Sequence, residues 1–455
     1  MKKRSYSYFV LLLFGVLFLL GSVWTIYLTS YKNVFVTNDY DLKRFLLLFF
    51  VFISSVLMLF VKKLTVIRLP IESCLAILCF FILGGVSSIF NENAYWGVID
   101  LSNYFLLLVV FYVLSICCNE FSMEAIYTAL YWLVLVFSLF LFVQFFLNLL
   151  FNLIDGNKPN IHHLISGFIN ARFLNQIQVI LMPFLFLPIA LKNLKGYSRI
   201  SIFFIAFHWM VLFQTEARGA LLCLVLSFCI VLFQVEKKLR SNMFCLILKT
   251  LLIGIGLWLF FIVALPWFFT GESIGTFRTS SSGRIEMWTF VLNEFYDALL
   301  LGYGPMSYAY AEGKPVGNAH PHNFLMQLLY EHGVLIFGVF ICWGGFLLWS
   351  ELVRIKEKIL SHSQILNFVA IWAAIGYSFL SGVFVMPFSQ LAFVLVLAVR
   401  IRSEKTIQLK LLWRLLLIGL VIFCCFIITS SYLPMEEWQK IYPRIWVNSF
   451  QAFHR

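Results

Sequence analysis

The sequence predicts an all-α protein that crosses a membrane about 12–13 times as helices. Of its 455 residues, 62% are hydrophobic and only 12% are charged, and the mean hydropathy is +0.93. Runs of roughly 20 apolar residues, long enough to span a bilayer as a helix, recur along the whole chain. This composition excludes a soluble domain.

The first apolar run, Tyr8–Thr29, follows Met-Lys-Lys-Arg in the manner of a signal peptide. It is too long for the apolar region of such a peptide, and no small-residue cleavage site follows it. We therefore expect it to be retained as the first span.

Thirteen spans account for the apolar runs. The two short spans on either side of Met386-Pro387 could alternatively form a re-entrant hairpin instead of two full spans. The expected spans are Tyr8–Thr29, Leu42–Val61, Ile71–Phe90, Tyr95–Ile116, Ala125–Phe151, Phe173–Leu191, Ile200–Gln214, Ala217–Val235, Leu246–Phe268, Asn323–Trp349, Ile365–Val385, Phe388–Val399 and Leu411–Tyr432. The ten cysteines lie within or at the ends of these runs, so we expect neither a disulfide framework nor a zinc site.

The net charge of +12 is explained by a membrane topology rather than by nucleic-acid binding. With the N-terminus in the cytoplasm, the inner loops carry most of the 33 Lys and Arg residues, as the positive-inside rule requires. These inner segments are Lys62-Lys63, Lys192–Arg199, Glu236–Arg240, Glu351–Lys358 and Arg400–Arg414. The outer face then carries a loop from Asn152 to Arg172, a tight turn at Thr215–Gly219 and a long loop from Phe269 to His322.

The long outer loop contains a predicted amphipathic helix over Gly283–Leu299. One face at helical spacing carries Ile285, Trp288, Val291 or Leu292, Phe295 and Leu299, which is typical of a helix on a membrane surface or over a cavity. The preceding Thr-Ser-Ser-Ser-Gly offers N-cap residues.

Two arginines on the predicted outer face are candidate anion ligands. Arg218 begins a span, beside Glu216, and Gly219 allows close approach of a ligand or another backbone. Arg284 begins the amphipathic helix, where backbone N–H groups and a guanidinium can converge on an anion. A snorkelling Arg218 and a solvated Arg284 are the alternative interpretations.

Histidines next to the following span are candidate acid–base groups. His322 precedes Asn323, a good N-cap, and the helix dipole there disfavours imidazolium, so a neutral ring can accept a proton. His320 competes for this role, and an inert loop histidine is the alternative for either. Glu331 lies within the next helix as an intramembrane candidate. The pair His162-His163 is expected to be solvated.

Three motifs resemble the O-antigen ligase-like superfamily. They are Glu-Ala-Arg-Gly-Ala at 216–220, Ser-Ser-Gly-Arg at 281–284 and His-Asn-Phe-Leu-Met-Gln-Leu-Leu-Tyr-Glu-His-Gly-Val-Leu-Ile-Phe-Gly at 322–338. The resemblance covers about residues 200–400, between a region of N-terminal helices at 1–199 and a C-terminal helix and tail at 401–455. Residues 170–178, Asn-Ala-Arg-Phe-Leu-Asn-Gln-Ile-Gln, are similar to a polar segment of some members.

The resemblance implies a GT-C-type membrane glycosyltransferase that needs neither metal nor cofactor. Its donor would be a glycan linked to undecaprenyl pyrophosphate, and its acceptor lipid A-core or another glycan, at the periplasmic face of the inner membrane. Arg218 and Arg284 would bind the pyrophosphate, and His322 would deprotonate or orient the acceptor hydroxyl; Glu216, His320 and Glu331 are further substrate-binding candidates. A protein O-oligosaccharyltransferase and a non-enzymatic flippase of lipid-linked oligosaccharide are the alternatives.

Overall fold

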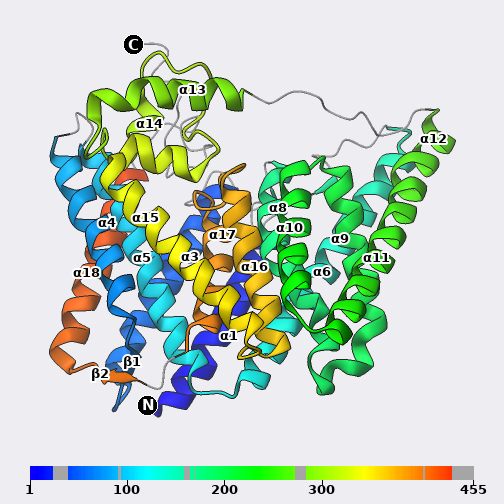
Figure 1. The fold of residues 1–455 in the computed structure, drawn as a ribbon, viewed down its shortest axis with the longest axis horizontal. Coiled ribbons are helices and arrows are strands. Elements are labelled where there is room, and N and C mark those ends of the chain that lie inside the picture. Colours follow the sequence, from blue (N-terminus) through cyan, green and yellow to red (C-terminus); the bar gives the residue numbers. More distant parts are fainter. Residues whose placement is uncertain are drawn as a thin grey trace.

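The computed structural model describes residues 1–23, 39–90, 94–157, 164–165, 167–168, 170–271, 283–402 and 405–432, and almost all of its elements are helices (Figure 1). The first half comprises α1 (Lys3–Val23), α3 (Asp39–Leu57), η1 (Met58–Phe60), β1 (Thr65–Ile67), α4 (Ile71–Ile89), α5 (Ala94–Cys118), α6 (Met123–Ile154), α8 (Ala171–Leu181), η2 (Met182–Ile189), η3 (Lys192–Tyr197), α9 (Ser198–Gln214) and α10 (Arg218–Gln234). The second half comprises α11 (Lys237–Trp258), η4 (Leu259–Ala264), α12 (Leu265–Thr270), α13 (Arg284–Glu294), η5 (Phe295–Ala298), α14 (Ser307–Tyr310), α15 (Phe324–Lys356), α16 (His362–Ser378), α17 (Pro387–Arg400), β2 (Thr406–Gln408) and α18 (Leu411–Tyr432).

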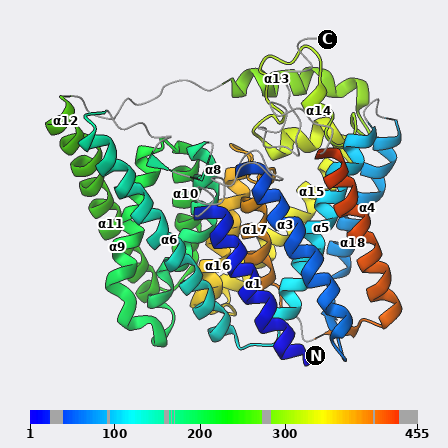
Figure 2. The ribbon, with the colours of Figure 1, turned by 180° about the vertical axis from the view of Figure 1, so that it is seen from behind.

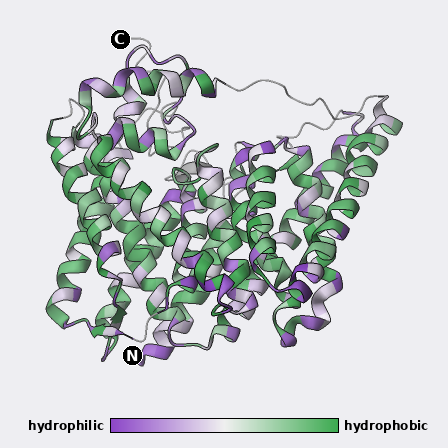
Figure 3. Ribbon diagram, in the orientation of Figure 1, coloured by the Kyte–Doolittle hydropathy of each residue, from purple (hydrophilic) through white to green (hydrophobic). Residues whose placement is uncertain are grey.

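Ten of the helices in the described ranges are long and apolar enough to cross a membrane. Two shorter apolar helices, α10 and α17, and the 17-residue α16 complete the set. Each of the thirteen predicted spans therefore has a helical counterpart, and the prediction of an all-α polytopic membrane protein is confirmed. Figure 3 shows that hydrophobic residues predominate along the helices and that many hydrophilic residues lie towards their two ends.

Helices α16 and α17 cross the bundle as two separate helices rather than forming a re-entrant hairpin. The segment 379–386 between them lies beside α8, because Gln176 bonds Ser381 there. At its other end, α17 finishes at Arg400, which pairs with Glu351 near the far end of α15.

The end of the bundle that carries the N-terminus is held together by polar contacts between loops. Lys3 pairs with Glu120 at 2.7 Å, Lys358 pairs with Glu236 at 3.5 Å, and Arg400 pairs with Glu351. The short strands β1 and β2 join two more of these loops in antiparallel register, with Val66 opposite Ile407, a pairing that the sequence did not predict. The segments predicted to share the inner side therefore do lie at one end.

The helices differ greatly in how deeply they are buried, as expected of a bundle with lipid around it. In the apolar stretch of α8 and η2, 83% of residues are buried, against 11% along α15 and 17% along α11 to α12. Figures 1 and 2 agree in placing α8 inside the molecule and α11 and α12 at its edge. The first turn of α8 is therefore held among other helices rather than in lipid.

At the opposite end, α13 and α14 lie over the bundle, next to the start of α15 (Figure 1). Helix α15 is interrupted at Gly333, whose φ of 68° and ψ of −176° are not helical. Backbone N–H groups of Tyr303 and Gly304 donate to the carbonyls of Tyr330 and Glu331, both at 2.9 Å. The loop after η5 thus satisfies backbone groups that the break in α15 leaves open.

Candidate functional site

Three arginines occupy the first turn of three helices at the α13 end of the molecule. Arg218 is the first residue of α10, Arg284 is the first residue of α13, and Arg172 is the second residue of α8. A helix N-terminus is already the positive end of the helix dipole, so a cation there is locally unfavourable. The same combination is favourable around an anion, which both the backbone N–H groups and the guanidinium can bind.

His322 is held in an unusual backbone conformation just before α15. Its φ is 54°, in the left-handed region that few non-glycine residues adopt. The next residue, Asn323, is the predicted N-cap, and its side chain accepts hydrogen bonds from the N–H groups of Leu325 (2.9 Å) and Met326 (3.2 Å). The conformation of this turn therefore fixes the direction in which the imidazole of His322 extends from the backbone.

His320 supports His322 directly. The backbone N–H of His322 donates to Nδ1 of His320 at 3.2 Å, and the two rings meet edge to face with centroids 4.2 Å apart. His320 is buried, whereas His322 is partly exposed. Of the two candidates for the acid–base group, His322 is thus the one that a ligand can reach.

Helix α13 is docked onto the segment that leads into His322. The indole N–H of Trp288 donates to the carbonyl of Pro321 at 3.0 Å. At the start of α13, Gly283 has a φ of 70°, and a Cβ there would lie 2.6 Å from the Val316 side chain. These contacts carry Arg284 to the neighbourhood of His322.

Burial and the charges of two of the three arginines together determine the electrostatic environment of His322. Its pKa is lowered to about 3, first by loss of hydration and then by the positive charges of Arg284 and Arg172. The same two charges act on Tyr377, near the end of α16. A neutral imidazole thus lies within the field of two guanidinium groups, from α8 and α13.

Arg218 is connected to the end of α16 through the next residue, Gly219. A Cβ on Gly219 would lie 3.2 Å from both Tyr377 and Leu380, so the start of α10 packs closely on the end of α16. Side chains, rather than the predicted ligand or backbone, therefore make the close approach at Gly219. Arg218 itself is exposed, and Glu216, in the preceding turn, is partly exposed with a φ of 50°.

Glu331 lies in the interior of the molecule, in contact with α14. Its Oε1 accepts the backbone N–H of Tyr308 at 3.3 Å, and its Oε2 accepts Nε2 of Gln327 at 3.1 Å. The side chain is 0% exposed. Its contacts hold the loop after η5 against α15.

The amphipathic helix is present, and its predicted apolar face is buried only in part. Val291 of that face is buried, as is Met287, and Trp288 and Phe295 are half-buried. Ile285, Leu292 and Leu299 are exposed. The residue at the N-cap is Gly283. The preceding Thr279–Ser282 and the pair His162-His163 lie outside the described residues.

Arg172 is the main site residue that sequence reasoning left out. It was visible within the polar segment 170–178 as an arginine just after the cap residue Asn170, whose side chain accepts the Arg172 N–H at 2.9 Å. The same signal, an arginine in the first turn of an outer helix, identifies Arg218 and Arg284 as candidate anion ligands. Tyr377 carried no comparable signal, because it lies within an apolar run.

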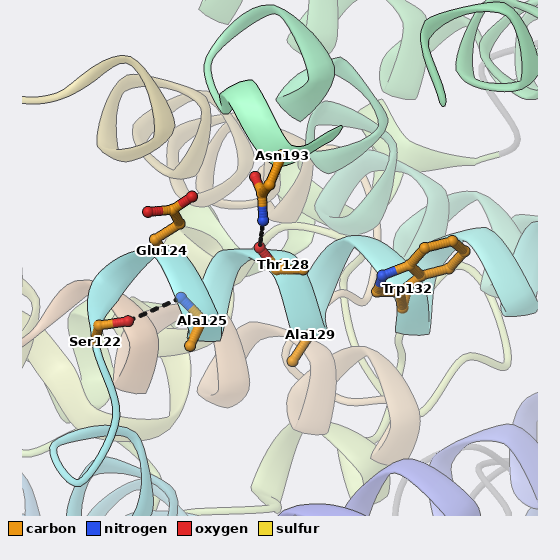
Figure 4. A pocket seen from close by; sticks show the side chains of 7 residues that line it. All are labelled: Ser122, Glu124, Ala125, Thr128, Ala129, Trp132 and Asn193. Atoms are coloured by element: carbon orange, nitrogen blue, oxygen red, sulfur yellow. Dashed lines mark hydrogen bonds between the residues drawn. The ribbon is translucent and has the colours of Figure 1, made fainter. Parts of the chain in front are cut away.

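An open depression of about 470 Å³ lies at the other end of the molecule, beside the start of α6. Figure 4 shows two of its hydrogen bonds, from the Ala125 N–H to Ser122 and from Asn193 to Thr128. Its lining contains none of the arginines or histidines described above: Ser122, Glu124, Ala125, Thr128, Ala129, Trp132 and Asn193.

Comparison with known proteins gives one match. Residues 201–341 match a family model described as O-antigen ligase. The matched region includes Arg218, Arg284, His320, His322 and Glu331. No curated protein and no solved structure matches the chain.

Proposed function

Because residues 201–341 match a family model described as O-antigen ligase, we propose that the protein moves a glycan from undecaprenyl pyrophosphate to an acceptor hydroxyl. The reaction takes place at the periplasmic face of the inner membrane, which is the face of α13 if the positive-inside rule sets the orientation. The acceptor is lipid A-core, for a ligase, or a second glycan, for a polymerase. The observation that carries the proposal is the position of His322 within the field of Arg284 and Arg172.

The arginines bind the pyrophosphate in this mechanism. As the bond between the anomeric carbon and the phosphate oxygen breaks, negative charge develops on the departing pyrophosphate. Charged donors already in place stabilise that charge, and each is worth on the order of 3 kcal/mol, or ~100-fold in rate. Arginine suits the task because its planar fork donates two parallel hydrogen bonds to phosphate oxygens.

His322 acts on the acceptor. Its neutral ring accepts the hydroxyl proton while the hydroxyl oxygen attacks the anomeric carbon, so the proton leaves with the imidazole and the bonding electrons leave with the pyrophosphate. The low pKa makes His322 a weak base in the empty protein. A bound pyrophosphate would offset the charges of Arg284 and Arg172 and raise the pKa, so the base gains strength once the donor is in place.

This proposal is tested with purified protein in liposomes, radiolabelled lipid-linked glycan, and lipid A-core or glycan acceptors. Covalent transfer of label to the acceptor supports it. Movement of the donor across the bilayer without cleavage of the glycan–phosphate bond would instead identify a flippase. Label that reached only a protein acceptor would identify a protein O-oligosaccharyltransferase.

A further inference from the structure

The side-chain amide of Gln176 joins two other parts of the structure to α8. Its Nε2 donates to Oγ of Ser381 at 3.0 Å, and its Oε1 accepts from Oγ of Ser389 at 3.1 Å. All three side chains are buried. Because a buried amide left unpaired is costly, these bonds fix the segment 379–386 and the start of α17 relative to α8.

The segment held in this way lies against His320. A Cβ on Gly382 would lie only 2.6 Å from Cε1 and 2.9 Å from Nε2 of the His320 ring. Gly382 is also anchored within its own turn, since its carbonyl accepts the N–H of Val385 at 3.0 Å. The backbone at Gly382 therefore forms a wall behind the imidazole of His320.

His320 passes this restraint on to His322. Its Nδ1 accepts the His322 N–H, which places the proton of the neutral His320 ring on Nε2, the side facing Gly382. The bond supports His322 in its left-handed conformation, which is strained for a residue with a side chain. A shift of the His320 ring would let this turn relax and would move the His322 side chain.

We propose that Gln176 is a positioning residue for transfer, acting through Ser381, Gly382 and His320 on the orientation of His322. This inference rests on the proposed role of His322 as the base. Gln176 also follows Arg172 by one helical turn, so α8 supplies both a pyrophosphate ligand and the support of the base. Displacements of about 1 Å at a reacting group cost up to roughly 100-fold in rate.

Helix α8 provides a matched control in Gln178. This side chain is equally buried, but its amide bonds Asn175 at 2.9 Å and His208 at 2.9 Å, away from the histidine pair. Gln176→Met and Gln178→Met each remove one buried amide while keeping the volume of the side chain. They therefore share the cost of lost buried hydrogen bonds but differ in their connection to His322.

The experiment measures transfer kinetics of both variants with radiolabelled lipid-linked glycan, alone and in a His322→Ala background. We expect Gln176→Met to lower kcat roughly 10- to 100-fold, with KM for the donor changed less than about twofold. In the His322→Ala background, where residual transfer is followed over long incubations, Gln176→Met should add no further loss. Gln178→Met should lower kcat much less than Gln176→Met in otherwise native protein.

Three results would overturn the inference: full kcat in Gln176→Met, an equal loss in Gln178→Met, or an undiminished loss when His322 is already alanine. Failure of the proposed function gives a different result. In that case His322→Ala alone would transfer glycan as fast as the native protein.

Discussion

The backbone N–H of His322 donates to Nδ1 of His320 at 3.2 Å. The imidazole of His320 therefore holds the backbone from which the imidazole of His322 extends. The two histidines therefore have different environments: His320 is buried against Gly382, and His322 lies within the field of Arg284 and Arg172.

The arginines should be needed for transfer and not for folding. Arg172→Ala, Arg218→Ala and Arg284→Ala should each lower transfer ~100-fold, because each removes a charge-assisted contact to the pyrophosphate. Lysine at each position should restore only part of the rate, since it cannot donate in a bidentate fork. Arg68→Ala, an exposed arginine at the opposite end, is the control and should transfer normally. Near-normal rates in all three alanine variants would leave these cations without a role in binding the donor.

The pH dependence of transfer should reflect the lowered pKa of His322, to which the nearby arginines contribute. The neutral ring is the active form, so kcat/KM should fall as pH drops through the pKa of the free protein, which lies well below the ordinary value of 6.5. Arg284→Gln removes one cause of the lowered pKa and should move this acid limb to higher pH. In the native protein, the acid limb of kcat should lie at higher pH than that of kcat/KM, because the bound donor offsets the arginines. An acid limb that did not move in Arg284→Gln would contradict the electrostatic coupling.

Only glycine should be tolerated at position 333, where α15 is interrupted. A Cβ at Gly333 would lie 2.4 Å from the carbonyl oxygen of Leu300, and the φ and ψ there are those of a conformation that only glycine adopts readily. We expect Gly333→Ala to destabilise the protein by at least about 2 kcal/mol, measured as a loss of thermal stability in detergent. Gly338→Ala, in the same helix, is the control, because a Cβ there has no neighbour within 4 Å. Equal stability of the two variants would show that the contact between α15 and the loop after η5 is dispensable.

The orientation in the membrane is tested with reporter fusions. Fusions after Lys238 and after Lys358 should be cytoplasmic, and a fusion near Gly313 should be periplasmic, because the positive loops lie at the end opposite α13. A cytoplasmic reporter at Gly313 would remove the arginines and His322 from the compartment of the acceptor.

Most helices could be predicted because most apolar runs are long and end at polar residues. Asn323 was recognised as an N-cap, and Arg218 and Arg284 as the first residues of helices, from local sequence alone. The pairing of β1 with β2 could not be predicted, since strands of three residues more than 300 positions apart leave no periodic pattern. The close approach of Gly302 to Gly333, where a Cβ on Gly302 would lie 2.5 Å from the backbone nitrogen of Gly333, was equally hidden in the sequence.

It was harder to predict which residues of the site lie close together in the folded chain. Nothing local in the sequence joins Arg172 to His322, although the charge of Arg172 helps to lower the pKa of His322 in the folded chain. The same holds for Gln176 and Ser381, which lie 205 positions apart and are bonded only in the folded chain.

The most direct test compares His322→Ala with His320→Ala in transfer of radiolabelled lipid-linked glycan. Loss of a general base typically costs ~100- to 10,000-fold, so His322→Ala should lose nearly all transfer while the donor still binds. His320→Ala should lose less, because it removes a support of the base and leaves the base in place. Full transfer by His322→Ala, whatever the rate of His320→Ala, would contradict the assignment of His322 as the group that accepts the acceptor's proton.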